Sequence, residues 1–253
     1  MDINLKIYTC LNPSNKSKYI MRWNMFINYI KAFNDNYIWT IEKDGKTLVV
    51  DPGDAGPVID YLKDKNLDYI LLTHKHMDHV GGVKELKNKY GAKVYGPLET
   101  KEYNDIILKD GDEFEILGEN FKVILTGGHT EDHISYLVED KLFCGDALFL
   151  AGCGRVFTKD YKKAFEGLNK LKDLYEDIYV YPAHEYSLAN LEFARSVISN
   201  EDLDKEYERV KKLREKNKIT LPSSIGKEEK INPFFLARDL DEFTQFRKKK
   251  DNF

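Results

Sequence analysis

The sequence is poor in cysteine and has no long apolar run. Its three cysteines, Cys10, Cys144 and Cys153, are an odd number spread over 253 residues, unlike the paired framework of a disulfide-bonded secreted protein. The apolar runs fall far short of the ~20 residues that span a bilayer, and the N-terminus lacks the basic, apolar and small-residue regions of a signal peptide. We therefore expect a cytoplasmic protein that does not enter a membrane.

A strong excess of positive charge is also missing. The formal net charge is −4 at pH 7 and the isoelectric point is about 5.9, whereas a nucleic-acid-binding domain is usually basic. With 42% hydrophobic and 32% charged residues, the composition is that of a globular protein. The length allows one large α/β domain, with or without a small C-terminal unit. We expect no nucleic-acid partner and, as the default, a monomer.

Segments with strand and helix patterns alternate along the chain. β-rich runs between turn residues predict strands, and apolar spacings of three and four predict helices. The predicted strands are residues 26–30, 37–41, 47–50, 68–72, 112–117, 121–125, 134–138, 142–144 and 178–180. The predicted helices are residues 57–65, 80–90, 161–175, 188–199 and 203–216. This order predicts an α/β fold in which two sheets are covered by helices.

The segment THKHMDH at residues 73–79 is the densest group of chemically active side chains. It follows a predicted buried strand, and His74, His76, Asp78 and His79 give it four metal-type ligands within six positions. Side chains in such a loop converge at the carboxyl end of a strand, where open α/β sheets bind ligands. Neutral imidazoles with a carboxylate suit zinc, and also iron or manganese. A solvated surface cluster is the alternative interpretation.

The other three histidines also follow predicted strands. His129 and His133 lie in GGHTEDH, and His184 ends YPAH. Asp146 follows the apolar strand LFCG, where an unpaired carboxylate would be costly unless it bound a cation or strong donors. These positions predict that the side chains join the cluster of residues 73–79, with Asp146 as a bridging ligand.

Residues 73–79 resemble the THxHxDH signature of the metallo-β-lactamase superfamily. Further segments resemble its glyoxalase II (hydroxyacylglutathione hydrolase) members, above all their bacterial form: FNDNYIW, VDPGDAGPV, VYGPLET, GHTEDHISY, LFCGDALFLAGCGRVF, AHEYSLANLEFA and VKKLREKNKITLP. The resemblance covers residues 25–253 and implies an αββα sandwich with a C-terminal helical subdomain. It divides the chain into an N-terminal extension at 1–24, a catalytic domain at 25–189 and a helical substrate-binding subdomain at 190–253.

The same resemblance implies two divalent metal ions per chain, with zinc as the first choice and iron or manganese as alternatives. Three residues would bind one ion, three others would bind the second, and one would bridge them: His74, His76 and His129; Asp78, His79 and His184; Asp146. His133 would support the site without binding metal, or be a hydrogen-bonded core histidine. Asp51 would orient the ligand loops, or only form the DPGD turn.

In this family, the metal pair supplies a hydroxide that hydrolyses S-D-lactoylglutathione to glutathione and D-lactate, the second step of methylglyoxal detoxification. The resemblance implies that Asp78 and Asp146 are the catalytic residues that orient the hydroxide. The partner would be a small-molecule glutathione thioester, contacted by Arg155, Phe157, Tyr186, Arg247 and Lys250. Arg247 and Lys250 are three residues apart and so share a helix face, although a solvated basic terminus would give the same pattern.

The sequence departs from the family pattern at several points. Asp132 replaces the second glycine of GHTxGH, Gly127–Gly128 stands where a proline is common, and Thr158–Asp160 lacks the usual Gly-Thr. The stretch that follows Asn232–Phe234 is shorter than in the family. We expect these changes to shift the fit of the substrate and to leave metal binding intact.

Other functions of the same fold provide the alternatives. A persulfide dioxygenase uses a single iron, and the complete second ligand set, Asp78 and His184 included, argues against it. A nuclease is disfavoured by the acidic balance, and an inert binding module by the intact ligand set. Cys144 and Cys153 lie near Asp146 in sequence, but the site is complete without a thiolate, and buried cysteines usually only pack.

Overall fold

The computed structural model describes residues 25–253; the predicted N-terminal extension, residues 1–24, lies outside the described residues. The first of two six-stranded sheets has the spatial order β1 (Phe26–Ala32), β2 (Asn36–Lys43), β3 (Lys46–Val50), β4 (Tyr69–Leu71), β5 (Lys93–Gly96) and β6 (Ile106–Ile107). β1 to β3 pair antiparallel, whereas β3 to β6 run parallel. Parallel neighbours need crossover connections, which α1 (Ala55–Leu62), α2 (Met77–Val80), α3 (Val83–Tyr90) and the 3₁₀ helix η1 (Leu98–Thr100) occupy.

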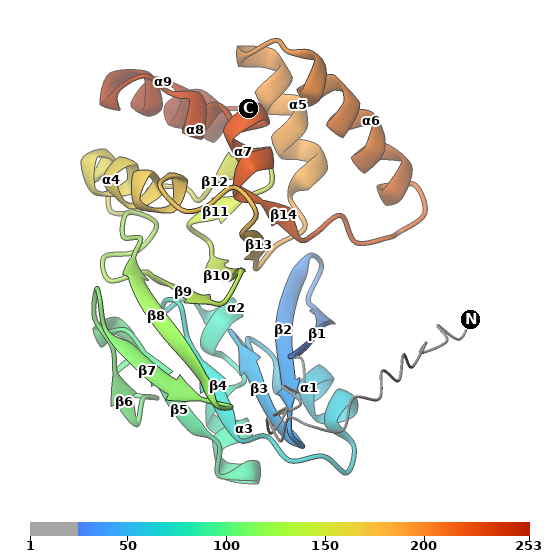
Figure 1. Cartoon of the computed structure of the whole chain (residues 1–253), viewed down its shortest axis with the longest axis vertical. Coiled ribbons are helices and arrows are strands. Elements are labelled where there is room, and N and C mark those ends of the chain that lie inside the picture. Colours follow the sequence, from blue (N-terminus) through green and yellow to red (C-terminus); the bar gives the residue numbers. More distant parts are fainter. Residues whose placement is uncertain (1–24) are drawn as a thin grey trace, which may run out of the picture.

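The second sheet has the order β14 (Ser223–Ser224), β13 (Tyr179–Pro182), β10 (Lys141–Gly145), β9 (Ile134–Val138), β8 (Glu119–Leu125) and β7 (Glu113–Ile116). β10 and β13 are parallel, and α4 (Tyr161–Lys172) lies between them in the chain. A separate ribbon pairs β11 (Leu148–Phe149) with β12 (Gly152–Cys153). The chain ends in α5 (Ser187–Val197), α6 (Glu201–Arg214), α7 (Ile225–Ile231), α8 (Pro233–Leu236) and α9 (Leu240–Asp251), which gather at the top of Figure 1.

Three hydrophobic clusters hold these layers together. Successive strand residues point to opposite faces of a sheet, so that Leu48 and Val50 face the second sheet while Val49 packs toward α1 and α3. In the second sheet, Phe121 faces inward and Ile124 packs in the cluster with α4 and the C-terminal helices. The clusters therefore fill three spaces: between helices and the first sheet, between the two sheets, and between the second sheet and helices. The predicted α/β sandwich is confirmed.

The order of the predicted elements agrees with the structure, but some elements differ. The predicted helix 80–90 is observed as α3, and the separate short helix α2 precedes it. Between them, a Cβ on Gly81 would lie 2.5 Å from the oxygen of Gly53, and one on Gly82 would lie 2.5 Å from the nitrogen of Ala55. These glycines therefore allow two backbones to approach closely. The short strands β5, β6, β11, β12 and β14 and the short helices α7 and α8 were not predicted. α5 crosses the predicted domain boundary at residues 189 and 190, so the division remains a prediction.

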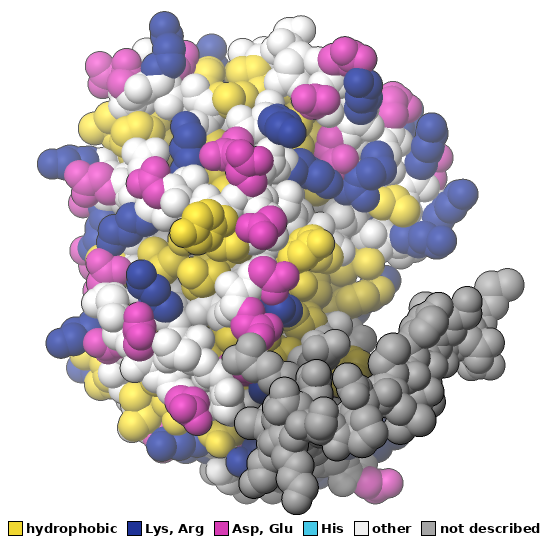
Figure 2. All heavy atoms as spheres, in the orientation of Figure 1, with side chains coloured by type: hydrophobic (Ala, Val, Ile, Leu, Met, Phe, Trp, Pro, Cys, Tyr) yellow, Lys and Arg dark blue, Asp and Glu magenta, His cyan; other side chains and the backbone are white. Residues whose placement is uncertain are grey.

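The surface in Figure 2 carries Lys and Arg side chains interspersed with Asp and Glu, and this face shows no large area of one charge sign. Among the helices of residues 25–253, none combines the length and the apolar character needed to cross a membrane.

Candidate metal centre

The histidines of residues 73–79 reach the centre because strand β4 stops and α2 begins at this point. His76 is the N-cap residue of α2, and Asp78 and His79 lie in its first turn. His74 and His79 are fully buried. The motif therefore lies at the carboxyl end of β4, at the edge where open α/β sheets bind ligands.

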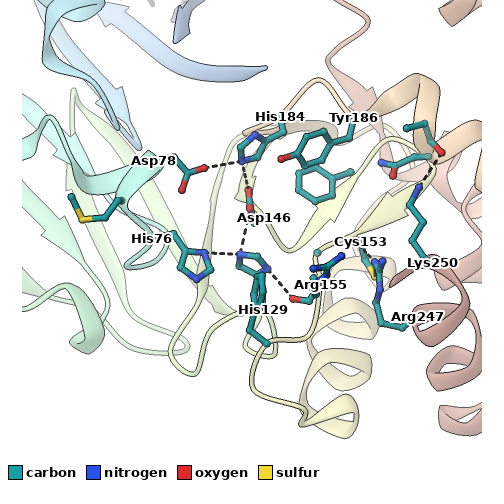
Figure 3. Close-up of a pocket in the computed structure, with 16 residues that line it drawn as sticks. His76, Asp78, His129, Asp146, Cys153, Arg155, His184, Tyr186, Arg247 and Lys250 are labelled. Carbon is teal, nitrogen blue, oxygen red and sulfur yellow. Dashed lines mark hydrogen bonds and ion pairs between the residues drawn. The ribbon is translucent and has the colours of Figure 1, made fainter. Parts of the chain in front are cut away.

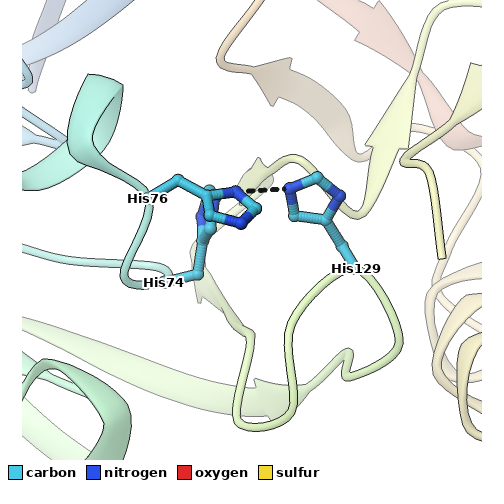
Figure 4. A group of neighbouring side chains, drawn as sticks. All are labelled: His74, His76 and His129. Carbon is cyan, nitrogen blue, oxygen red and sulfur yellow. Dashed lines mark hydrogen bonds between the residues drawn. The ribbon is translucent and has the colours of Figure 1, made fainter. Parts of the chain in front are cut away.

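His74, His76 and His129 form a first group of ring nitrogens (Figure 4). Nε2 of His74 and Nε2 of His129 each lie 3.0 Å from Nδ1 of His76. Metal–nitrogen bonds of 2.0–2.1 Å at tetrahedral angles would put neighbouring ligand atoms roughly 3.3 Å apart. The spacing of the group is therefore close to that of a metal site.

Asp78, His79 and His184 form a second group. Oδ2 of Asp78 lies 3.5 Å from Nε2 of His79 and 3.4 Å from Nε2 of His184. These separations are too long for strong hydrogen bonds and suit atoms that face a common ion.

Asp146 stands between the two groups. Its Oδ2 lies 3.3 Å from Nε2 of His129, and its Oδ1 lies 3.3 Å from Nε2 of His184 and 3.5 Å from Nε2 of His79. Nε2 of His79 and Oδ1 of Asp146 are buried without a hydrogen-bond partner among the described residues. A buried polar atom without a partner is costly, and a cation between these two atoms would remove that cost.

The charges at the centre also favour a cation. Burial holds the pKa of His74 well below its usual value and lowers the pKa of His129 to about 4, so both rings are neutral, as metal ligands must be. Burial opposes charge on His79 as well, but Asp146 and Asp51 raise its pKa well above normal. The pKa of Asp146 is low in spite of burial, because His79 and His184 surround it. Positive charge is thus stabilised between the carboxylates.

Asp51 and His133, whose roles the sequence left open, both contact residues of the cluster. Asp51 has φ +53° and accepts hydrogen bonds from the backbone and hydroxyl of Thr73, and its Oδ2 lies 3.0 Å from Nδ1 of His79. His133 is fully buried, and its Nε2 accepts the backbone N–H of Asp146. Asp51 therefore does more than form a turn, and His133 holds the segment that carries Asp146.

One pocket of about 640 Å³ joins this centre to the predicted substrate contacts. His76 and Asp78 lie at one side in Figure 3, and Arg247 and Lys250 lie at the other. The five side chains expected at the substrate all line it: Arg155, Phe157, Tyr186, Arg247 and Lys250. A volume in this range suits a small organic molecule.

The side chain of Arg247 is more buried than we would expect for a residue in a solvated basic terminal helix. Its Nη1 donates to the backbone oxygen of Cys153 at 2.7 Å, its Nη2 lies 3.0 Å from Asp251, and its Nε has no hydrogen-bond partner within residues 25–253. Lys250 donates to the backbone oxygen of Ala189 and lines the same pocket. Both cations therefore face the pocket from the C-terminal helix, and the solvated-terminus interpretation does not hold for Arg247.

The side chains nearest the centre are aromatic. The ring of Tyr186 stacks on His184 with centroids 4.6 Å apart, and Phe157 meets the edges of His76 and His129. Cys153 lines the pocket without joining either ligand group, and burial raises its pKa to about 11. At neutral pH this thiol is protonated.

The departures from the family pattern have local explanations. Gly128 has φ +126°, and a Cβ there would lie 2.5 Å from Ala164 in α4. Thr158 donates its hydroxyl to the oxygen of Gly128. The backbone N–H of Asp132 donates to Glu99. These contacts fasten the His129 loop to η1 and α4 with residues other than the usual ones.

Two side chains at the start of β2 and in the turn before it contact the centre, although no motif indicated them. Oδ1 of Asp35 lies 2.9 Å from Nδ1 of His184, and Asn36 donates to Oδ2 of Asp78 at 3.2 Å. The segment FNDNYIW carries these residues, but nothing in its spacing points to partners so distant in the chain.

Comparison with known proteins identifies the family. The chain matches the model of the metallo-beta-lactamase superfamily over residues 33–105 and that of the hydroxyacylglutathione hydrolase C-terminus over residues 185–253. It is 45% identical to the hydroxyacylglutathione hydrolase of Actinobacillus pleuropneumoniae serotype 5b and 46% identical to that of Haemophilus ducreyi; in each case the match covers 90% of this chain and 99% of the relative. The chain belongs to the hydroxyacylglutathione hydrolase family.

Solved structures agree with this family at the level of the fold. ETHE1 from Myxococcus xanthus has a TM-score of 0.71 at 24% identity, covering 88% of this chain and 90% of its own. TTHA1623, described in a di-iron-bound form, has a TM-score of 0.59 at 22% identity, covering 83% of this chain and 99% of its own. The sandwich is thus a metallo-β-lactamase fold with a C-terminal helical region typical of the hydroxyacylglutathione hydrolases.

Proposed function

We propose that this protein is a thioester hydrolase that cleaves S-(2-hydroxyacyl)glutathione, with S-D-lactoylglutathione as substrate and glutathione and D-lactate as products. This is the second step of methylglyoxal detoxification. The single observation that carries the proposal is the pocket that joins the His and Asp cluster to the cations Arg247 and Lys250. Relatives at 44–46% identity over nearly their whole length carry the hydroxyacylglutathione hydrolase name, which favours this activity over a persulfide dioxygenase or a nuclease.

The donor set fits two divalent metal ions. His74, His76 and His129 would hold one, Asp78, His79 and His184 would hold the other, and Asp146 would present one oxygen to each. Divalent cations at this position would acidify a shared water and polarise the thioester carbonyl. We propose zinc in both sites, with iron or manganese as alternatives, because imidazole and carboxylate together accept all three.

The chain's own carboxylates would direct the attacking oxygen. Asp78 and Asp146 face the same space, and the nearby histidines keep both ionised in spite of burial, because they hold the two pKa values below the normal range. Each can accept a hydrogen bond from the O–H of the attacking water or hydroxide and hold its oxygen toward the carbonyl carbon. The carbon–sulfur bond then breaks, and glutathione leaves as the thiolate.

Substrate recognition would fall to the other end of the pocket. Arg247 and Lys250 supply positive charge for the carboxylates of glutathione, and Arg155 adds a third cation whose side chain is about half exposed. Tyr186 and Phe157 border the ligand histidines and would exclude water from the thioester. In this proposal, residues 190–253 act as the substrate-binding subdomain of a catalytic domain at residues 25–189.

Hydrolysis of S-D-lactoylglutathione by purified protein, with metal content measured on the same sample, tests the proposal. We expect turnover with about two metals per chain, and loss of both turnover and metal in His74→Ala. Lys75→Ala is the matched control, because this lysine lies within the motif but its side chain is 55% exposed. Two bound metals without thioester turnover would overturn the proposed substrate, and protein that binds no metal would overturn the mechanism.

We also propose that the protein acts as a cytoplasmic monomer on a small-molecule substrate, without nucleic acid. The low cysteine count and the acidic balance of the sequence support this. Size-exclusion chromatography with light scattering measures the assembly state, and a stable dimer would contradict the proposal.

A further inference from the structure

The turn between β1 and β2 contacts two ligands of the second group with its side chains. Oδ1 of Asp35 lies 2.9 Å from Nδ1 of His184. The Asn36 amide donates to both the backbone oxygen and Oδ2 of Asp78, at 3.3 and 3.2 Å. Asp35 in the turn and Asn36 at the start of β2 thus hold a histidine and an aspartate from the segments that follow β13 and β4.

The backbone of the same turn is fastened on both sides of His184. Tyr37 donates its N–H to Ala183 at 2.7 Å, and Glu185 donates its N–H to Asp35 at 2.9 Å. Asn36 and His184 form an isolated β-bridge. These backbone bonds do not depend on side chains, so a substitution at Asp35 leaves the docking of the hairpin in place.

These contacts fix the tautomer of His184 and the orientation of Asp78 that metal binding requires. With Nδ1–H of His184 donating to Asp35, the proton is on Nδ1, and the Nε2 lone pair points to Asp78 and Asp146. Such a carboxylate–histidine pair fixes the tautomer and ring orientation of a metal ligand. The amide of Asn36 likewise holds Oδ2 of Asp78 in the position where it faces His79 and His184.

The first group is oriented by other residues. Nδ1 of His129 lies 2.9 Å from the backbone oxygen of Arg155, and Nδ1 of His74 lies 3.0 Å from Oγ1 of Thr73. Within residues 25–253, no hydrogen bond joins Asp35 or Asn36 to this group. A defect in the hairpin should therefore affect the two metal positions unequally.

We infer that Asp35 and Asn36 are positioning residues for the second metal site alone, so that the β1–β2 hairpin sets the affinity of one ion without setting that of the other. This inference rests on the proposed two-metal centre. It assigns to the first hairpin of the fold a task that the metal motif itself, some forty residues further along the chain, does not reveal.

The experiment compares wild type, Asp35→Ala, Asn36→Ala and Asp35→Asn. Each protein is loaded with zinc and dialysed against graded concentrations of a chelator, and zinc per chain is measured together with kcat and KM. Loss of a partner that orients a metal ligand typically weakens binding 10- to 100-fold. We expect Asp35→Ala and Asn36→Ala to lose one ion at roughly 10- to 100-fold lower chelator and to keep the other at the wild-type concentration.

Asp35→Asn should fall between wild type and Asp35→Ala, because the amide oxygen still accepts the Nδ1–H but carries no charge. Asp60→Ala is the control, since Asp60 is an exposed aspartate of α1, and its chelator profile should match the wild type. Asp35→Ala protein that keeps both ions at the wild-type concentration, or loses both together, overturns the inference. A wild-type protein that binds fewer than two ions overturns the two-metal centre itself, and the two failures are thus distinguished.

Discussion

Oδ2 of Asp51 lies 3.0 Å from Nδ1 of His79 and also accepts the hydroxyl of Thr73 at 2.6 Å. The carboxylate is buried and connects the end of β3 to the metal motif after β4. Because one side chain orients both the strand end and a ligand, its charge should matter more than its volume.

Asp51→Asn is expected to keep the fold and weaken metal binding. The amide has nearly the same shape but loses the negative charge beside His79, and loss of such a partner costs about 10- to 100-fold in metal affinity or activity. Zinc content after dialysis and kcat/KM for S-D-lactoylglutathione measure the effect. Unchanged values would show that Asp51 only shapes the turn.

We predict that kcat/KM falls in alkaline solution because Lys250 loses its charge. Burial, with Arg247 nearby, lowers its pKa to about 8. The ammonium is the form that attracts a carboxylate, so binding of the thioester should weaken as the pH rises through about 8. kcat/KM reports the ionisation of the free enzyme. Lys250→Arg keeps its charge and should remove this fall, while Lys249→Arg on the exposed side of α9 should retain it.

Lys250→Ala should raise KM about 10-fold or more with little change in kcat, because a hydrogen bond to a charged group contributes about 1.5–3 kcal/mol and uniform binding appears in KM. Lys249→Ala provides the control. Equal KM values in the two variants would place the substrate carboxylates elsewhere.

We predict that the free energy of unfolding declines as the pH rises, because of the buried carboxyl of Glu228. Its carboxyl accepts hydrogen bonds from Ser223 and the backbone of Ala151, yet burial raises its pKa to about 7 from an ordinary value of 4.5. In the unfolded chain this carboxyl loses its proton at a lower pH than in the folded protein. Its contribution to the free energy of unfolding is therefore fully present below pH 4.5 and is lost as the pH rises to about 7. The loss is on the order of 3 kcal/mol.

The side chain of Glu228→Gln stays neutral, so the free energy of unfolding of this variant should change less with pH in this range than that of the wild type. Urea unfolding of both proteins at pH 5 and pH 8 tests this, because the difference between the proteins cancels the titration of other groups. A gap between them that is the same at both pH values would contradict the prediction.

Gly145 should not tolerate a side chain. It has φ +48°, and a Cβ would lie 2.3 Å from Oγ1 of Thr73 and 3.0 Å from Nε2 of His133. Gly145→Ala is expected to displace Asp146 and to lower both zinc content and the free energy of unfolding. Gly111 has φ +80° with nothing within 4 Å, so Gly111→Ala shows the backbone strain alone, about 1 kcal/mol. Similar effects of the two variants would contradict the steric argument.

The metal motif could be predicted because its geometry is local. Residues 73–79 span one loop and one turn of helix, so the spacing of His74, His76 and His79 is set by the backbone between them. Asp146 and His184 could be predicted too, because each ends an apolar strand, and the ends of neighbouring strands meet at a sheet edge. The alternation of apolar residues likewise indicated the two sheets.

Tertiary packing decided the partners that orient these ligands. Asp35 meets His184 across 149 residues, and Arg247 meets the backbone of Cys153 across 94. Pairs so distant in sequence leave no periodic signal, because they form only when separate layers pack together. The need for Gly81 and Gly82 between α2 and α3 has the same origin, since the approach of residues 53–55 leaves no room for a side chain there. The sequence by itself determined which side chains could serve as metal ligands, and the packing of the layers determined how those side chains are held.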